Sequence, residues 1–561
     1  MLVIATMGPA GVAQAQIAPS QVTPRSLRPE PPPMSTPIQL PRSLPSEAPA
    51  GAADLPITVG EILAEGSYPE MAEETRAIFA PLVGRPITVG DLYRAAAAVE
   101  SAYSRRGYFL ARVVVSEQRV AAGETFRVVI VDGFIESLDD GALPRRIRTP
   151  IHGVMRGIVG KRRPMLADLQ RRLALAGAVP GARLRSTLAK GERPGGARLI
   201  LDGGYKPFGL TIGADNRLGP AFNNWGVNLQ ATINSPTGHG EQLYAFLSGQ
   251  PRLDETFRKD SLRRVAGGGF TLPLTSWGLT INPEFTYSNT NPRVSNPLLA
   301  SNGRLYRGTV NLIAPLLSTA VGSLTARLGL EVTDERQTLP AFDFTLSKDR
   351  LTVLRANLAW RGQFGAGGSI VAETTLSQGI DALGARTASS IAASNAPSSR
   401  GSDPQFTRAE LRLTTQQRLI EGAVLTVIGR AQTSFGTVVP NSETFDLTGL
   451  DGLSTFTAGL LSADGGVMLR SELGRTLTLP AGAARLFATP YLFAAVGRSH
   501  FVVRDALNPN VATSYGLGLR LAAQGLPLGA APTASIEYGH GDQNRGGASD
   551  DRVSVSLGVQ F

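Results

Sequence analysis

A strict alternation of apolar and polar residues fills the chain from about residue 205 to its end, and this pattern constrains the fold most. One segment places Leu324, Ala326, Leu328, Leu330 and Val332 on one face, with polar or small residues between them. Side chains that alternate with a period of two belong to β-strands whose two faces meet different surroundings. The C-terminal part of the chain is therefore expected to be all β.

Alternation by itself fits either a soluble β-sandwich or a membrane barrel. Three features favour the membrane. The alternating segments reach about ten residues, longer than the usual globular strand of about five or six. Short turns are interleaved with long polar loops such as 388–405 and 540–551, and the chain ends within an alternating segment on Phe561. No apolar run approaches the ~18 residues of a membrane-spanning helix, so we predict a transmembrane antiparallel β-barrel over residues 205–561.

Composition argues against several kinds of chemistry. The chain contains 0 Cys, which removes disulfide scaffolds, thiolate metal sites and thiol nucleophiles. His152, His239, His500 and His540 lie far apart without metal-ligand spacing, and Gly267–Gly269 lacks the Lys-Ser/Thr of a phosphate-binding loop. The net charge is +10, but Lys and Arg are scattered rather than gathered into a phosphate-binding stripe. We expect no enzyme activity, no cofactor or metal, and no nucleic-acid partner.

The first 55 residues lack the pattern of a folded domain. Residues 1–15 combine a short apolar stretch with Ala13-Gln14-Ala15, a small-x-small pattern typical of signal-peptidase sites. A chance spacing of alanines is the alternative, because no Lys or Arg precedes the apolar stretch. Residues 16–55 are Pro-rich and are expected to form an extended arm. Three prolines between residues 19 and 29 make a long helix unfavourable, so we expect little or no helical plug here.

Residues 56–204 contain two successive blocks of helical and extended patterns, at 56–133 and 134–204. In the first block, Thr88 has the sequence context of a helix N-cap, with Asp91 as the capping-box acid. The expected helices are 69–82, 88–106, 145–158 and 165–176, and the expected strands are 108–115, 125–131, 134–138, 182–188 and 197–202. Seven basic residues of the second block would either receive an acidic partner or form a solvated helix face. They are Arg145, Arg146, Arg148, Arg162, Arg163, Arg171 and Arg172.

Several short motifs in these regions occur together in one family. They are Tyr103-Ser104-Arg105-Arg106-Gly107-Tyr108, Val131-Asp132-Gly133, Gly177-Ala178-Val179-Pro180-Gly181, Asp215-Asn216-Arg217, Leu376-Ser377-Gln378-Gly379 and Arg470-Ser471-Glu472-Leu473. In this combination the chain resembles the TpsB transporters of two-partner secretion, within the BamA superfamily. The resemblance implies an outer-membrane barrel of about 16 strands, preceded by two α+β POTRA domains in the periplasm. These domains would capture an unfolded exoprotein, which then leaves through the pore. Outer-membrane lipids and the barrel assembly machinery are further implied partners, with Phe561 as the insertion signal.

The chain departs from the family pattern at the loop that folds into the pore. The family places V-R-G-Y/F at the loop tip and F-x-D-x-G on a facing strand, and the Arg and Asp of these motifs pair inside the barrel. The matching positions here are Leu453, Ser454, Thr455 and Phe456 in the loop, Arg470 and Glu472 on the strand after it, and Phe493, Ala495 and Gly497 on the facing strand. Both charges are missing together, which leaves no unpaired charge and predicts a loop anchored in a different way. A slipped alignment is the alternative. The departure also leaves open a passive pore or a barrel-assembly factor without secretion activity.

Overall fold

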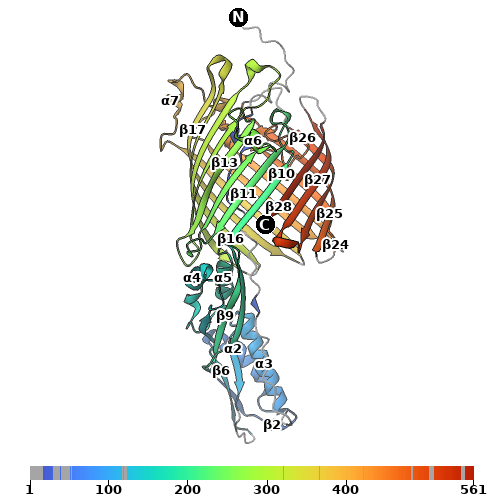
Figure 1. Cartoon of the computed structure of the whole chain (residues 1–561). Coiled ribbons are helices and arrows are strands. Elements are labelled where there is room, and N and C mark those ends of the chain that lie inside the picture. Colours follow the sequence, from blue (N-terminus) through green and yellow to red (C-terminus); the bar gives the residue numbers. More distant parts are fainter. Residues whose placement is uncertain are drawn as a thin grey trace.

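A computed structural model of the chain describes residues 17–29, 38–39, 51, 53–116, 118, 123–319, 321–365, 367–420, 422–481, 484–503, 511–544 and 550–561. It consists of a closed β-barrel with two small α/β units stacked below one rim (Figure 1). The expected signal peptide at 1–15 lies outside the described residues. No helix in the described part of the chain is both long and apolar enough to cross a membrane.

The barrel is antiparallel throughout and closes by pairing its first strand, β10, with its last, β28. β23 and β24 pair with successive parts of β25, so they form one strand that is interrupted at Thr476. Within the described residues the barrel therefore has sixteen strands, which confirms the predicted fold class. The strands are β10 (Phe208–Asp215), β11 (Gly226–Asn234), β12 (Gln242–Gly249), β13 (Arg263–Pro273), β14 (Thr280–Thr290), β15 (Asn302–Ser318), β16 (Gly322–Leu339), β17 (Phe344–Phe364), β18 (Gly368–Ile380), β19 (Thr407–Arg418), β20 (Ala423–Thr433), β23 (Gly465–Arg475), β24 (Leu477–Ala481), β25 (Ala484–His500), β26 (Val511–Gln524), β27 (Ala531–Gln543) and β28 (Asp550–Gln560).

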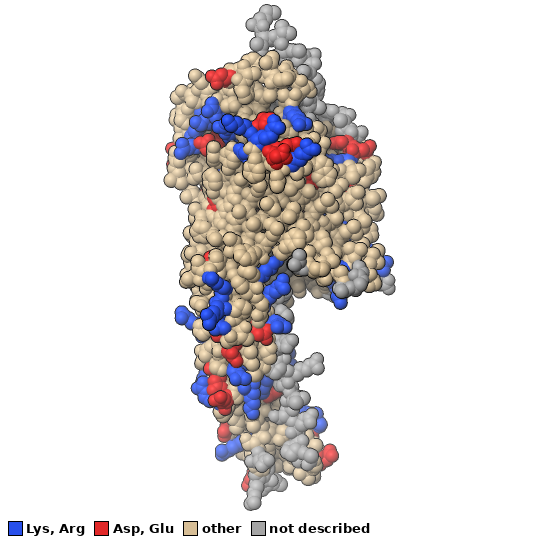
Figure 2. Space-filling view, viewed as in Figure 1, with Lys and Arg blue, Asp and Glu red and all other residues tan. Residues whose placement is uncertain are grey.

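The two faces of the barrel wall differ as the alternation predicts. Leu328 and Leu517 point outward and are 57% and 56% exposed, whereas Glu331 and Thr333 on the same strand as Leu328 are buried. Figure 2 shows a broad belt of the barrel surface that is nearly free of charged residues, below a rim rich in both signs of charge. An apolar belt around a polar interior is the arrangement that a bilayer requires of a barrel.

Short elements lie in the connections between the barrel strands. They are η5 (Pro220–Phe222), α6 (Leu253–Phe257), η6 (Pro297–Leu299), η7 (Pro340–Phe342), α7 (Ala388–Ala392), η8 (Ser399–Gly401), η9 (Asn441–Glu443), β21 (Phe445–Asp446), β22 (Ser462–Ala463) and η10 (Pro527–Gly529). The expected loop 388–405 lies within the connection from β18 to β19. The expected loop 540–551 is shorter than predicted, because β27 continues to Gln543 and β28 begins at Asp550.

The first α/β unit packs its helices against a three-stranded sheet of order β3-β6-β5. The Thr88 side chain accepts a hydrogen bond from the Asp91 N–H at 3.2 Å, and the Asp91 carboxylate accepts one from the Thr88 N–H at 2.8 Å. This confirms the predicted capping box of α3. The elements are β2 (Pro56–Thr58), β3 (Glu61–Glu65), η2 (Pro69–Met71), α2 (Ala72–Phe79), η3 (Ala80–Leu82), β4 (Pro86–Thr88), α3 (Val89–Arg105), β5 (Arg112–Val115) and β6 (Thr125–Val131).

β3 was absent from the order predicted for this unit, which began with a helix. Its residues Glu61–Glu65 include no period-two signal strong enough to separate a strand from a helix. The segment becomes a strand because it pairs in parallel with β6, a contact between residues far apart in the chain. β5 is also shorter than the predicted strand 108–115 and begins at Arg112.

The second α/β unit repeats the topology of the first. In both units the first strand pairs in parallel with the last, and the middle strand pairs antiparallel with the last. β1, from the Pro-rich arm, adds a short parallel strand beside β8. The elements are β1 (Ile38–Gln39), β7 (Phe134–Asp139), α4 (Arg145–Met155), η4 (Arg156–Ile158), α5 (Leu166–Gly177), β8 (Ala182–Lys190) and β9 (Gly196–Tyr205).

Basic residues of the second unit connect it to its two neighbours. The Arg163 guanidinium lies 4.1 Å from the centre of the Tyr68 ring and donates to Asp132 of the first unit at 3.1 Å. On the barrel side, Arg146 donates to the Pro236 carbonyl, and its own carbonyl accepts from the Ser235 hydroxyl at 2.8 Å. Arg146 and Arg163, two of the seven basic residues, therefore contact the neighbouring units and do not belong to a purely solvated face.

Candidate functional site

Residues 17–29, called the luminal segment from here on, lie inside the barrel. Ser20 donates through its N–H and its hydroxyl to Glu335 of β16, and Ser26 donates to Glu284 of β14. Pro19–Val22 form one 3-10 turn, η1, and the other described residues of the segment are not helical. This agrees with the expectation of little or no helical plug. The prediction of an extended arm over residues 16–55 missed that its first part fills the pore.

Residues 434–464, the inward loop, connect β20 to β23 and also fold into the lumen. The loop contains η9, β21 and β22, and its side chains form a buried apolar cluster with the neighbouring wall strands. The cluster consists of Phe445, Leu447, Leu453, Phe456, Leu461, Met468, Ala495 and Ala512. Apolar packing thus attaches the loop to β23, β25 and β26.

The loop tip carries the expected motif positions Leu453, Ser454, Thr455 and Phe456, and all four are buried. The Ser454 hydroxyl accepts a hydrogen bond from Arg470 at 3.1 Å, and the Ser454 carbonyl accepts one from the Ser554 hydroxyl at 3.3 Å. The tip is therefore held to β23 and β28 by hydrogen bonds.

Arg470 is the centre of a buried charge network. Its guanidinium donates to Glu472 at 2.8 Å, to Glu537 of β27 at 2.6 Å and to the Gly452 carbonyl at 3.2 Å. It also lies 4.0 Å from the centre of the Phe493 ring. A guanidinium with several partners in fixed directions is well suited to hold a loop and a wall together.

The facing strand β25 brings its expected positions to the loop. Ala495 lies directly opposite Arg470 in the strand register, and Phe493 lies opposite Glu472. A Cβ on Gly497 would lie 2.6 Å from Leu447 and 3.1 Å from Leu453, so the absence of a side chain admits the loop. The motif positions of the loop and the facing strand thus meet in space, with apolar packing where the family carries an Arg and Asp pair.

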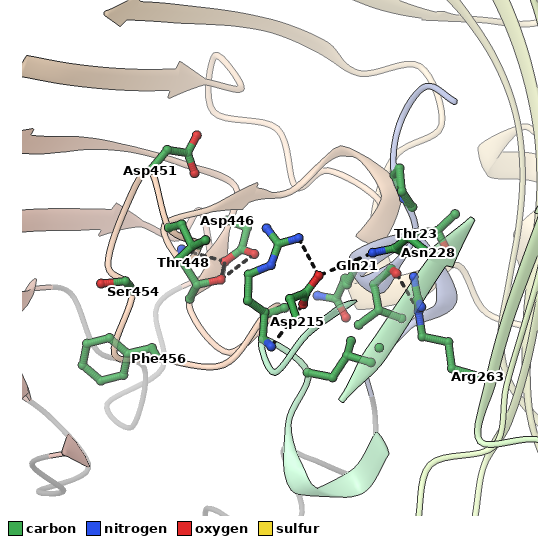
Figure 3. Close-up of a pocket in the computed structure, with 18 of the residues that line it drawn as sticks. Gln21, Thr23, Asp215, Asn228, Arg263, Asp446, Thr448, Asp451, Ser454 and Phe456 are labelled. Carbon is green, nitrogen blue, oxygen red and sulfur yellow. Dashed lines mark hydrogen bonds and ion pairs between the residues drawn. The ribbon is translucent and has the colours of Figure 1, made fainter. Parts of the chain in front are cut away.

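A cavity of 560 Å³ separates the luminal segment from the inward loop. Figure 3 shows Asp446, Thr448 and Ser454 of the loop on one side, and Thr23 with Arg263 on the other. The lining mixes apolar residues with eight charged ones, which are Asp215, Arg217, Arg263, Arg412, Arg430, Asp446, Asp451 and Arg552. Water and polar chain can be accommodated in such a space, whereas the outer wall favours lipid.

Comparison with known families identifies the chain. The model described as haemolysin secretion/activation protein ShlB/FhaC/HecB matches residues 200–521, and the ShlB-type POTRA domain model matches residues 58–133. The chain belongs to the ShlB/FhaC/HecB family. It is thus an outer-membrane transporter of two-partner secretion, with its POTRA units in the periplasm.

Individual relatives of this ShlB/FhaC/HecB protein are distant in sequence. It is 25% identical over 422 residues to the hemolysin transporter protein ShlB of Serratia marcescens, covering 73% of this chain and 70% of that protein. It is 23% identical over 428 residues to the heme/hemopexin transporter protein HuxB of Haemophilus influenzae, covering 74% and 72%. Among solved structures it resembles CdiB from Escherichia coli, with a TM-score of 0.72 at 19% identity, covering 98% of this chain and 95% of that one. CdiB from Acinetobacter baumannii gives a TM-score of 0.60 at 15% identity, covering 94% and 95%.

Sequence reasoning missed a second charge network in the ShlB/FhaC/HecB barrel, centred on Glu443 of the inward loop. The buried carboxylate pairs with Arg355 of β17 at 2.6 Å, with Arg408 of β19 at 2.8 Å and with Arg25 of the luminal segment at 3.5 Å. Glu443 therefore connects the loop, the wall and the luminal segment. It sits in an ordinary polar loop sequence, which carries no signal of this role.

Two remaining expectations concern the chain end and the histidines. The Phe561 N–H donates to the Leu210 carbonyl at 2.8 Å, so the last residue extends the seam of the barrel.

His152 contacts Asp140 and His540 contacts Asp551. In the described residues no group of three or more His, Cys, Asp or Glu is arranged to hold a metal ion.

Proposed function

We propose that this transporter captures an unfolded exoprotein with its POTRA units and passes it through the barrel once the luminal segment and the inward loop have moved. The observation that carries the proposal is a polar pore filled by two segments of the chain itself, each held by hydrogen bonds and ion pairs. Relatives named hemolysin transporter and CdiB support a secreted protein as the partner. Folding of the exoprotein outside would supply the energy.

Strand addition to the first POTRA unit is the capture step that we propose. β5 is an edge of its sheet, with no further strand beside it among the described residues. Glu100 accepts the Val113 N–H at 2.8 Å, so this N–H points away from β6. Because strand residues alternate, the Val115 N–H also points outward, and it is available to an extended chain.

A Val115→Pro substitution tests this step. Proline removes the outward N–H of the edge while leaving the ladder to β6 in place. We expect export of the cognate exoprotein to fall about fivefold, which corresponds to one lost hydrogen bond of about 1 kcal/mol. Secreted and periplasmic exoprotein are compared by immunoblot. Val115→Ala keeps the N–H and is expected to export normally; equal export by both variants would contradict capture at β5.

We propose that the motif positions at the loop tip hold the inward loop inside the barrel and so keep the pore closed. These contacts are called the lock. In this proposal Leu453 and Phe456 pack the tip against Ala495, Gly497 makes the space, and Arg470 with Glu472 and Phe493 holds Ser454 and Thr455 in place. A lock of this kind also removes the main argument for a passive pore, which was the missing Arg and Asp pair. The support for it is the set of contacts of Arg470.

We further propose domain limits at 16–55, 56–133, 134–204 and 205–561. β6 ends at Val131 and β7 begins at Phe134, which supports the second limit, while β9 reaches Tyr205. Outer-membrane lipids would cover the belt seen in Figure 2, and the barrel assembly machinery would recognise the strand that ends at Phe561.

A further inference from the structure

The barrel wall binds the luminal segment mainly through main-chain groups. Arg263 of β13 donates to the Val22 carbonyl at 2.9 Å, Arg307 of β15 donates to the Pro24 carbonyl at 3.0 Å, and Gln230 of β11 donates to the Leu27 carbonyl at 2.8 Å. Carbonyls of this kind are present in every residue of every polypeptide.

Two wall carboxylates accept main-chain N–H groups of the luminal segment, and together with the three donors above they form a row of five side chains. Glu335 of β16 accepts the Ser20 N–H at 2.8 Å, and Glu284 of β14 accepts the Leu27 N–H at 3.0 Å. The five side chains, Gln230, Arg263, Glu284, Arg307 and Glu335, come from β11 and from the adjacent strands β13 to β16. They follow the segment from Ser20 to Leu27 and offer both donors and acceptors.

The wall groups are oriented by contacts of their own. Arg263 also donates to the Ser248 hydroxyl at 2.7 Å, and Tyr244 donates to Glu284 at 2.9 Å. The side chains would therefore keep their orientation if the luminal segment left. Their remaining hydrogen-bond donors and acceptors would then be unpaired in a confined space. Unpaired buried polar groups are costly, so another main chain is a favourable replacement.

Space along the row is left by glycine and by the cavity. A Cβ on Gly267 would lie 2.7 Å from the Leu27 side chain, and a Cβ on Gly303 would lie 2.6 Å from the ring of Pro19. The cavity of 560 Å³ borders the same segment at Val22 and Pro24. The glycines thus let the Pro19 and Leu27 side chains approach the wall closely, and the cavity leaves free space beside the middle of the segment.

We propose that this row is a binding site for extended polypeptide main chain, which the luminal segment occupies at rest and an exported chain occupies in transit. The second half of this statement rests on the proposed transport function. A passing exoprotein presents a changing series of side chains, and only its main chain stays the same. A site that forms hydrogen bonds to carbonyls and N–H groups can bind each successive segment of the exported chain weakly, whatever its sequence.

The test uses one introduced thiol in the full-length protein, whose sequence contains 0 Cys. Ser288 is buried, and its hydroxyl lies 2.8 Å from that of Thr23 in the luminal segment. In a Ser288→Cys protein in proteoliposomes, the rate of reaction with a membrane-impermeant maleimide reports how well the segment covers the wall. In a second protein, the residues at positions 21, 22, 23, 27 and 28 are shuffled, so that a foreign sequence is the probe, while Ser20, Pro24, Arg25 and Ser26 are kept because Glu335, Glu443 and Glu284 contact the side chains of Ser20, Arg25 and Ser26.

We expect the shuffled protein to react within about threefold of the unshuffled rate, because its main chain makes the same hydrogen bonds. Arg263→Gln with Arg307→Gln is expected to raise the rate at least about tenfold in both proteins. Arg264→Gln is the matched control, since this neighbour lies over the Tyr287 ring on the outer face and its loss should change nothing. Gln230→Ala removes one uncharged contact and should give a smaller rise.

Rapid labelling of the shuffled protein would overturn the proposal, because the wall would then bind the segment through its particular side chains and not through its main chain. Unchanged labelling in the arginine double variant and in Gln230→Ala would overturn it as well. Heat-modifiable gel migration confirms that each variant is a folded barrel. No exoprotein takes part in the labelling, so a failure of export would count against the transport function and leave the result at this site standing.

Discussion

At the scale of single residues, Arg470 of β23 donates hydrogen bonds to the loop tip, where the family pattern carries a further arginine in the loop itself. It lies opposite Ala495, where the family carries an Asp, and it donates a hydrogen bond to Ser454 at the loop tip. Arg470 belongs to a strand motif that the chain shares with the family, so the wall keeps its arginine while the loop tip lacks one. A buried guanidinium with Glu472 and Glu537 as partners stays paired, and this is the condition for keeping it inside.

Arg470→Gln is therefore expected to release the loop tip. The substitution leaves the buried Glu537 without its cation, whereas Glu472 keeps Arg520 at 2.8 Å, and breaking a buried pair in this way costs about 3–5 kcal/mol. In a Thr455→Cys protein, whose introduced thiol replaces a buried hydroxyl, we expect maleimide labelling to rise by about tenfold or more. Arg475→Gln, at the exposed end of the same strand, is the control. Equal labelling in the two variants would show that Arg470 does not hold the tip.

At the scale of elements, one carboxylate connects strand β7 of the second POTRA unit to the turn between β8 and β9. Glu136 of β7 accepts the N–H groups of Arg193 at 3.1 Å and Glu192 at 2.9 Å, in the turn between β8 and β9. The Arg193 side chain donates to it at 2.8 Å. The backbone N–H of Arg193 first, and then its guanidinium, lower the pKa of Glu136 below the ordinary value of 4.5.

This shift predicts how the hairpin responds to pH. A carboxylate whose pKa is lowered by folding stabilises the folded form at every pH above 4.5, and the effect is lost as the pH falls through the lowered value. Hydrogen exchange of residues 189–197, corrected for the intrinsic rate, should show protection at neutral pH that weakens in acid. Glu136→Gln should lack this change, and the exposed Glu192→Gln should retain it. A pH response that survives in Glu136→Gln would assign it to another group.

At the scale of the whole molecule, closure of the barrel depends on contacts between the two ends of its sequence. β10 and β28 pair from Thr211 with Gln560 to Asp215 with Ser556. The seam continues at Phe561, which exchanges main-chain hydrogen bonds with Leu210 at 2.8 Å and 3.4 Å. The last strand must therefore be synthesised before the barrel can close.

Phe561→Ala is expected to slow assembly more than it lowers stability. The main-chain bonds to Leu210 survive the substitution, so the free energy of unfolding should change by only about 0.5 kcal/mol. Pulse-chase samples analysed by heat-modifiable migration should show a delayed folded form, while Gln560→Ala, an exposed neighbour, should assemble normally. Assembly of Phe561→Ala at the normal rate would remove its role as an insertion signal.

The sequence by itself determined the barrel wall, most helices of the POTRA units and the cap at Thr88. Their signals are local, since strand alternation and a capping box are complete within a few residues. The family motifs also marked Ser454 in the loop and Ala495 on the facing strand as matching positions, but not the contacts that anchor the loop. β3 escaped prediction because its pairing with β6 bridges distant parts of the chain.

Only the tertiary structure decided what fills the pore. Glu443, Arg355 and Arg408 are separate polar residues in sequence, and they form a network because the barrel curves their strands and the inward loop toward one point. The luminal segment is held largely through its carbonyls and N–H groups. Because every residue carries these groups, no pattern of residue types could mark the segment in advance.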